Sequence, residues 1–307
     1  IGYALIKVND GELVNQGLEF DLTGHILRSN DLYLDLTVNG EILKNKITKM
    51  PIDPATGEEK ILDVQTRYGW GVDHSIFDFY IREFCGVDPQ DGRSTWTMYY
   101  DDINGDGQPN AGENVTSLHQ FLSENPDKEG DLIKTTTKTY QSATQLYVGK
   151  SAIPKVRGAV NLATGFKGLE LSIQMLYSFG GYAYDVAYAT LMNNDPIGGN
   201  NWHTDIRDRW QQAGDVTDVP RLSNFYTTDR NVNSSSTRFL TKADYLILNN
   251  VRLGYNLPAD LVGRMKMTAA SIWVSGDNLW LKSERAGFNP STHEAGSSDM
   301  YRYSPVS

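Results

Sequence analysis

The sequence predicts an all-β protein whose antiparallel strands form a transmembrane β-barrel. Apolar and polar residues alternate in one segment after another, as expected for strands with one apolar and one polar face. Many of these segments run for about ten residues, whereas strands of globular proteins average about five or six and a bilayer requires about nine to eleven. The connections alternate between short and long, as they do in outer-membrane barrels.

The alternation can be followed along six segments. These are residues 17–26, 32–40, 155–166, 169–179, 245–258 and 266–280. In the first two, the apolar set consists of Leu18, Phe20, Leu22, Ile26, Leu32, Leu34, Leu36 and Val38. On the opposite face, we expect side chains that line a wet lumen, namely Asp35, Asn39, Lys155, Arg157, Asn161, Glu170 and Gln174.

The connections support a barrel because their lengths alternate regularly. The short ones are residues 28–31, 88–92, 166–168 and 258–264. The long ones are residues 51–73, 101–151, 192–238 and 283–300. Since outer-membrane barrels have short periplasmic turns and long extracellular loops, we expect the long connections to lie outside the cell.

Composition narrows the possible classes of protein. The 307 residues carry a net charge of −10, which argues against nucleic acid as a partner. Cys85 is the only cysteine, so no internal disulfide can form. No apolar run approaches the length of a transmembrane helix, and the mean hydropathy is −0.44. Helical membrane spans are therefore excluded, whereas a membrane barrel is not.

Residues 102–113 match the calcium-binding loop pattern D-x-N-x-D-G-x5-E. The predicted oxygen ligands are the side chains of Asp102, Asn104 and Asp106, the carbonyl of Gln108, a water held by Asn110, and bidentate Glu113. The preceding residues read as a strand, and a short helix is indicated only after the loop, so the scaffold is not an EF-hand. A structural calcium ion would order this long loop. The alternative is that Asp, Asn and Gly simply form turns here.

Two of the long connections carry aromatic residues beside polar ones, a combination that can stack on sugar rings or grip peptides. The candidate substrate-binding residues are Tyr68, Trp70, Trp202, His203, Asp205 and Trp210. The alternative is that these residues pack within their own loops or form the aromatic girdle at the membrane interface.

Catalytic motifs are absent from the sequence. The five histidines show no spacing typical of a zinc site, and there is neither a G-x-S-x-G motif nor a P-loop. We therefore expect that the protein is not an enzyme.

Several segments resemble TonB-dependent transporters of the SusC/RagA type. Residues 245–258 ("YLILNNVRLGYNLP") and 274–281 ("VSGDNLWL") resemble the penultimate strands of that family. Residues 12–22 ("ELVNQGLEFDL") and 77–92 ("FDFYIREFCGVDPQDG") resemble two further family motifs, and the D-x-N-G-D-G loop also recurs there. These matches span nearly the whole chain in the expected order.

The resemblance implies a bacterial outer-membrane barrel of about 22 strands from a Bacteroidota-type organism. This chain would supply about eight strands of its C-terminal part. We expect the N-terminal plug, the TonB box and the last strand to lie outside this sequence. Family members import glycans or oligopeptides with energy from TonB, under a SusD-like surface lipoprotein that acts as a lid. The implied partners are thus TonB, this lipoprotein, the substrate and outer-membrane lipid.

Two other classes remain open. A secreted β-sandwich that binds carbohydrate and carries a calcium loop would share the alternation, the aromatic residues and the acidic charge. It would have shorter strands and would be self-sufficient at 34.3 kDa. A plug-free, porin-like channel would share the barrel but need neither TonB nor a lid.

Overall fold

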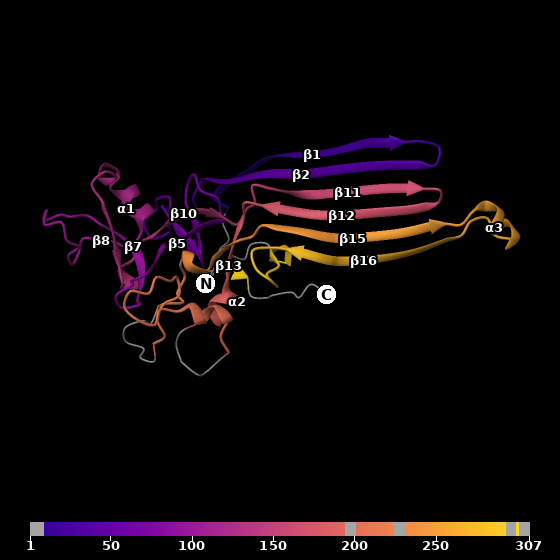
Figure 1. Cartoon of the computed structure of the whole chain (residues 1–307). Helices are drawn as coiled ribbons and strands as arrows, with labels where there is room; N and C mark the ends of the chain where they lie inside the picture. Colours follow the sequence, from indigo (N-terminus) through magenta and orange to yellow (C-terminus); the bar gives the residue numbers. More distant parts are fainter. Residues whose placement is uncertain (1–8, 194–200, 224–230, 293–298, 301–307) are drawn as a thin grey trace, which may run out of the picture.

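The computed structural model describes residues 9–193, 201–223, 231–292 and 299–300. Within these residues, six strands form one antiparallel sheet in the order β1-β2-β11-β12-β15-β16, here called the long sheet (Figure 1). The strands are β1 (Glu12–Arg28), β2 (Leu32–Lys49), β11 (Val156–Phe166), β12 (Leu169–Phe179), β15 (Tyr245–Asn256) and β16 (Ser271–Lys282). Each is long enough to cross a bilayer, which agrees with the predicted strand length.

The register gives the long sheet one polar and one apolar face. One row of directly paired residues consists of Thr23, Thr37, Asn161, Gln174, Asn250 and Asp277. The adjacent row consists of Gly24, Leu36, Leu162, Ile173, Val251 and Gly276. Because neighbouring residues of a strand point to opposite faces, the two rows belong to opposite sides of the sheet.

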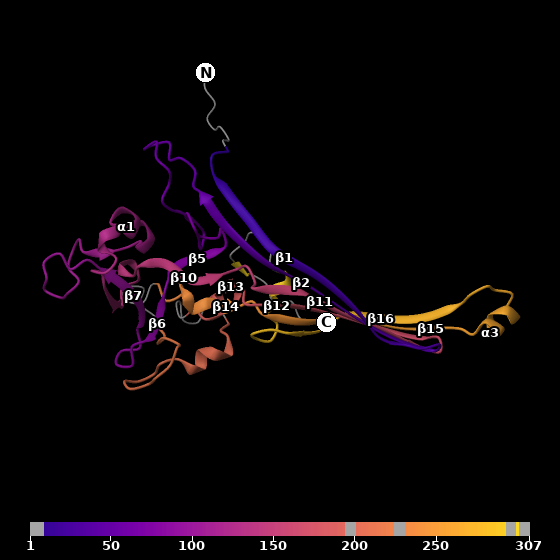
Figure 2. The same ribbon diagram turned by 90° about the horizontal axis from the view of Figure 1, so that it is seen from above.

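The two faces differ in how their side chains are satisfied. On the polar face, the Gln174 amide donates to Asn161 Oδ1 at 2.9 Å and accepts from the Asn249 amide at 2.7 Å. On the apolar face, Leu22 and Ile272 are 66% and 72% exposed. The apolar face is therefore not covered at these positions by the described residues, and the sheet is a single layer in Figure 2.

Three connections lie together at one end of the long sheet, here called the turn end (Figure 1). Lys167 and Gly168 join β11 to β12 with φ angles of 48° and 87°. Positive φ at both central residues is the requirement of a tight hairpin turn, and glycine meets it without strain. Residues 29–31 join β1 to β2, and residues 257–270, which include α3 (Ala259–Arg264), join β15 to β16.

The opposite end carries several small sheets, which Figures 1 and 2 show clustered beyond the long sheet. One consists of β3 (Asp63–Gln65), β4 (Tyr68–Trp70), β5 (Asp78–Arg82) and β10 (Gln145–Ser151). A second consists of β6 (Phe84–Val87), β7 (Ser94–Tyr100), β8 (Asn114–Val115) and β9 (Ile133–Thr137). A third consists of β13 (Tyr182–Asp185), β14 (Leu240–Lys242) and β17 (Asp299–Met300), where β13 and β17 pair in parallel.

Two details of the predicted topology are wrong. The described long sheet has six strands rather than about eight, because residues 77–102 form the short strands β5, β6 and β7 outside it. Their lengths of 5, 4 and 7 residues are below what a bilayer requires. Consequently the turn at residues 88–92 does not lie with the other short turns. Connection length alone does not reveal at which end a turn lies.

The long connections pack into one body, here called the loop unit, which comprises the described residues of 50–155, 180–244 and 283–292. Its core contains Tyr68, Phe79, Ile81, Tyr184, Ala189, Met192, Ile206, Val219 and Phe239. These residues come from two insertions far apart in sequence. The helices α1 (Leu118–Glu124) and α2 (Val186–Leu191) also belong to this unit. In the described part of the chain, no helix is long and apolar enough to cross a membrane.

Trp210 holds the turn at residues 88–92 against a second insertion. Its indole N–H donates to the Pro89 carbonyl at 3.0 Å. Gly92 has a φ of 71°, and a Cβ on it would lie 2.4 Å from the Trp210 ring. The Gly92 carbonyl also accepts from the Arg221 N–H at 3.0 Å. The turn thus packs against Trp210, which lies 121 positions after Pro89 in the sequence.

We expect Gly92→Ala to destabilise the loop unit by roughly 1–3 kcal/mol, because the new Cβ adds a steric clash to an unfavourable positive φ. Gly57→Ala is the matched control, since Gly57 has a φ of 76° and a Cβ on it would meet no atom within 4 Å. Thermal unfolding and limited proteolysis within residues 201–223 measure the difference. Equal effects of the two substitutions would contradict the docking role of Trp210.

Candidate functional site

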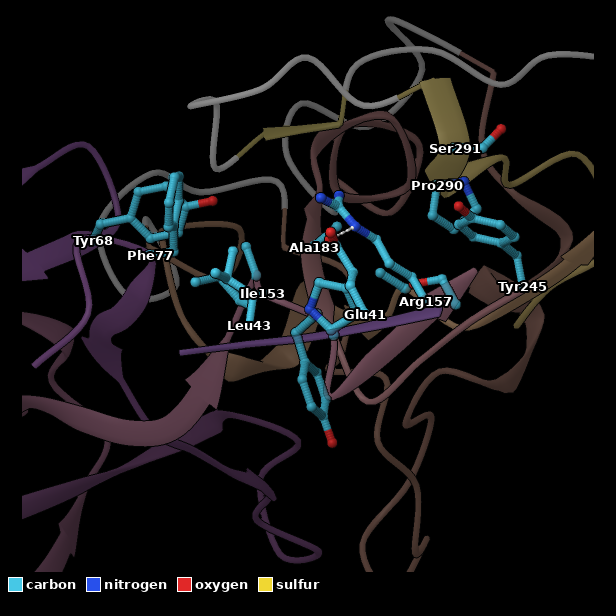
Figure 3. Close-up of a pocket in the computed structure, with 16 residues that line it drawn as sticks. Glu41, Leu43, Tyr68, Phe77, Ile153, Arg157, Ala183, Tyr245, Pro290 and Ser291 are labelled. Atoms are coloured by element: carbon cyan, nitrogen blue, oxygen red, sulfur yellow. Dashed lines mark hydrogen bonds and ion pairs between the residues drawn. The ribbon is translucent and has the colours of Figure 1, made fainter. Parts of the chain in front are cut away.

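A cavity of about 370 Å³ lies where the polar face of the long sheet meets the loop unit (Figure 3). This volume is within the range of small-molecule binding sites. The lining residues are Glu41, Leu43, Tyr68, Phe77, Ala152, Ile153, Pro154, Arg157, Ser178, Gly181, Tyr182, Ala183, Ala243, Tyr245, Pro290 and Ser291. Both the sheet and the loop unit therefore contribute to its walls.

The sheet contributes one row of paired residues to the cavity. Glu41 lies opposite Arg157, Arg157 opposite Ser178, and Ser178 opposite Tyr245. This row lies four residues along each of β2, β11 and β12 from the polar row of Thr37, and therefore on the same face. The cavity is thus located at the loop end of the polar face.

Glu41 and Arg157 form an ion pair inside the cavity, which Figure 3 marks with a dashed line. Their side chains are 30% and 54% exposed. An ion pair this accessible contributes at most about 1 kcal/mol to stability. Both charged groups therefore remain available to a ligand. The sequence predicted Arg157 as a lumen residue but missed Glu41, whose role depends on its pairing across strands.

The loop unit supplies an apolar wall. Tyr68 is buried, and its ring contacts the rings of Phe77 and Phe79 at centroid distances of 5.9 and 5.0 Å. Burial raises the pKa of Tyr68 above its ordinary value, so its hydroxyl is neutral at physiological pH. Figure 3 shows Tyr68 and Phe77 on one side of the cavity and Tyr245 and Pro290 on the other.

The six candidate substrate residues do not converge on one site. Of them, Tyr68 alone is among the residues that line the cavity. The three tryptophans each donate an indole N–H to a backbone carbonyl: Trp70 to Ile76 at 3.1 Å, Trp202 to Asn193 at 2.8 Å and Trp210 to Pro89 at 3.0 Å. These bonds hold the loops together, as expected for partly buried tryptophan.

His203 and Asp205 belong to a polar network around Tyr188. The Tyr188 hydroxyl donates to Asp205 Oδ2 at 2.7 Å, and the His203 ring meets the Tyr188 ring edge-on. Burial and then the bond to Asp205 raise the pKa of Tyr188 to about 12. The guanidinium of Arg285 stacks on Tyr188 and pairs with buried Asp185 at 3.1 Å. The network joins the second insertion to the segment that follows β16.

The predicted calcium loop is held by its own hydrogen bonds. Asp102 accepts from the N–H groups of Asp106 and Gly107, at 3.1 and 2.9 Å. The bond from the Gln108 N–H is the main cause that lowers the pKa of Asp106. The Asn110 side-chain amide donates to Asp106 and to the Gln108 carbonyl, at 3.0 and 3.1 Å.

The oxygens proposed as calcium ligands thus face the amides of the loop itself. Glu113 is buried and its Oε2 accepts from the Asn110 N–H at 2.8 Å. Among the described residues, no group of three or more His, Cys, Asp or Glu side chains is arranged to hold a metal ion. The donor types fit calcium, but several oxygens would have to exchange amide partners for the ion. Calcium binding therefore stays a prediction.

A cluster of aromatic rings joins α1 to the sheet formed by β3, β4, β5 and β10. The His74 ring stacks on Tyr147 with centroids 3.4 Å apart, and His119 meets both rings edge-on at 5.4 and 5.2 Å. Burial, followed by the nearby His74, lowers the pKa of His119 below its ordinary value. His74 Nδ1 lies 3.6 Å from Asp78. The cluster is packed around neutral His119.

Comparison with known proteins supports the fold and the resemblance. No protein-family model matches the chain. TonB-dependent receptor P3 of Formosa agariphila is 26% identical over 295 residues, which are 92% of this chain and 25% of that protein. TonB-dependent receptor P26 of the same organism is 25% identical over 281 residues, with 90% and 25% coverage. The chain thus spans about a quarter of the length of these relatives.

Solved structures give the same result for the fold. The RagAB peptide transporter matches with a TM-score of 0.70 and 24% identity over 96% of this chain and 28% of that one. The RagAB peptide importer in its closed-closed state matches with a TM-score of 0.69 and 23% identity. These matches confirm the predicted fold class, an antiparallel barrel wall. Together with the sequence relatives, they confirm the resemblance to TonB-dependent transporters of the RagA type.

We expect the loop unit to lose stability as pH falls below the ordinary histidine pKa of 6.5. The folded pKa of His119 lies below the unfolded one, so the unfolded chain takes up the proton first and gains population in acid. His119→Phe should flatten this part of the stability profile, whereas Gln120→Ala, at an exposed and uncharged neighbour on α1, should leave it in place. Chemical denaturation between pH 5 and pH 8 measures both profiles. An unchanged profile for His119→Phe would show that this histidine does not titrate with unfolding.

Proposed function

We propose that this chain forms part of an outer-membrane barrel that imports large nutrients in a TonB-dependent manner. The observation that carries this proposal is the single-layer long sheet, with a polar face on one side and an exposed apolar face on the other. A soluble β-sandwich would bury that apolar face against a second sheet. The similarity to TonB-dependent receptors favours energised import over a plug-free channel.

The cavity favours oligopeptides over glycans as the substrate. Most of its walls are apolar or aromatic, and Glu41 and Arg157 provide its paired charges. A peptide offers an apolar side chain for the walls and backbone or terminal groups for the two charges. The structural neighbours are described as a peptide transporter and importer, which supports the same choice.

The proposal extends to partners and to the rest of the protein. The loop unit would face the cell exterior and meet a SusD-like lipoprotein that covers the lumen. TonB would act on a plug domain located in another part of the protein, and this chain would be a C-terminal portion of the barrel. The similarity of the fold to RagAB, over about a quarter of that chain's length, supports this arrangement.

The cavity can be tested by filling it. In the complete transporter, Ala243→Phe should place a ring among the lining residues and weaken oligopeptide binding about tenfold or more, because burial of one apolar side chain contributes about 1.5–3 kcal/mol. Ala55→Phe, at an exposed position of the loop unit, is the control. Calorimetry with oligopeptides and with oligosaccharides of similar size, followed by cellular uptake, gives the readout. Unchanged peptide binding, or selective loss of oligosaccharide binding, would contradict the peptide assignment.

We also propose that calcium orders the loop at residues 102–113. When bound, the ion would supply positive charge to the oxygens of Asp102, Asn104 and Asp106, with Glu113 closing the site. The carboxylates would turn from the loop amides toward the ion, and the Asn110 amide would leave Asp106. The ordered loop would then shape the surface that meets the lipoprotein lid.

Calcium titration of the complete transporter, followed by calorimetry and by the thermal stability of the loop unit, tests this proposal. The double variant Asp102→Asn with Asp106→Asn should lose binding, because two ligand charges are removed. Asp127→Asn, an exposed acidic residue outside the loop, should bind like the parent protein. If both variants bind calcium equally well, the loop is not a calcium site, and its Asp, Asn and Gly residues only form turns.

A further inference from the structure

One connection at the turn end of the long sheet projects beyond its neighbours. Phe166 pairs with Leu32 and Leu169, and Leu169 pairs with Tyr255, so these strands end at the same level. The first two hairpins then close with residues 29–31 and 167–168. The third continues through residues 257–270, and Figures 1 and 2 show α3 extending past the other two turns. We name residues 257–270 the projecting turn.

The projecting turn is a folded element. The Leu257 N–H donates to the Ala270 carbonyl at 3.0 Å, which closes its base. Val262 is 1% exposed, and its carbonyl accepts from the N–H groups of Met265 and Met267 at 3.0 and 3.2 Å. The base is also tied to the neighbouring turn, because the Asn256 N–H donates to the Gly168 carbonyl at 2.8 Å. The side chains on its surface are therefore presented on an ordered backbone.

Three large apolar side chains on this element are exposed to solvent. Leu261, Met265 and Met267 are 46%, 54% and 41% exposed. The element follows directly from the strands whose exposed apolar side chains belong to the apolar face, with Leu253 paired to Val274 and Tyr255 paired to Ile272. Exposed apolar side chains thus occur both at the ends of these strands and on the projecting turn. Several large apolar side chains exposed on one ordered element indicate an interaction surface.

Cations accompany the apolar side chains. Arg264 and Lys266 are exposed and lie on either side of Met265, and Lys167 is in the adjacent turn that contacts the base. Asp260 is the one acidic residue in the projecting turn. Apolar side chains interleaved with Lys and Arg are typical of elements that lie in the headgroup region of a membrane, where the cations meet phosphate groups.

We propose that the projecting turn binds the phospholipid leaflet at the turn end of the barrel, with its apolar side chains at the acyl boundary and Arg264 and Lys266 on headgroup phosphates. This assignment rests on the proposed membrane function, because it requires that the apolar face of β15 and β16 contacts the lipid of the same leaflet. The element anchors the hairpin β15–β16 and fixes the height of this part of the wall in the membrane.

The test uses the complete transporter with Cys85→Ser as background, reconstituted in vesicles of phosphatidylethanolamine and phosphatidylglycerol. An environment-sensitive fluorophore is attached at Met265→Cys. Val216→Cys, a 94% exposed apolar position of the loop unit, is the water control, and Ile272→Cys on the apolar face is the lipid control. The label at residue 265 should show a blue-shifted emission and an iodide quenching constant at least about twofold below that of residue 216. Nitroxide on the lipid headgroups should quench it.

Each outcome decides the proposal. Quenching by iodide equal to that at residue 216 would place the projecting turn in water and overturn it. Protection from iodide without quenching by lipid nitroxide would indicate a protein partner and would also overturn it. Arg264→Glu with Lys266→Glu should abolish the lipid signal at residue 265 while that at residue 272 persists. If residue 272 also shows no lipid contact, the proposed membrane function itself fails.

Discussion

The structure depends on the alternation of side chains along the strands of the long sheet, which places mainly apolar side chains on one face and most of the polar ones on the other. A shift of one residue in any pairing would exchange the two faces of a strand. Packing at one crossing point opposes such a shift. The Tyr177 hydroxyl donates to the Asn39 carbonyl at 2.9 Å, across Gly158 of the intervening strand. A Cβ on Gly158 would lie 2.1 Å from the same carbonyl, so only glycine fits between the two.

The polar face and the loop unit together create the cavity. The sheet alone provides a row of charged and polar side chains, and the loop unit alone provides a wall of aromatic rings. Their junction gives Glu41 and Arg157 an apolar surrounding on one side and access to the polar face of the long sheet on the other. Such a site can hold a ligand of mixed character, because apolar contact and charge recognition occur within one volume.

The sequence predicted those features that depend on local periodicity. The long strands and the polar positions Asn161 and Gln174 followed from alternation alone. The pairing of Glu41 with Arg157 did not, because it requires the register between strands 116 residues apart. Likewise, the aromatic residues of the loops were recognised, but the partner of Trp210 lies 121 residues away. The residues that precede the calcium loop were recognised as a strand, whereas the sheet that this strand, β7, joins depends on tertiary packing that a short stretch of sequence does not contain.

The shared core of the loop unit has a consequence for how such proteins diversify. Phe79 from the first insertion and Phe239 from the second lie in one core, so neither insertion has a complete interior of its own. If a single insertion were transferred to another barrel, its core residues would lose their partners, and the remaining insertions of the host would not fit against it. The smallest part that can be exchanged as a folded unit is therefore the matched set of insertions. Recombination between barrels should succeed when that set travels together and fail when it is divided.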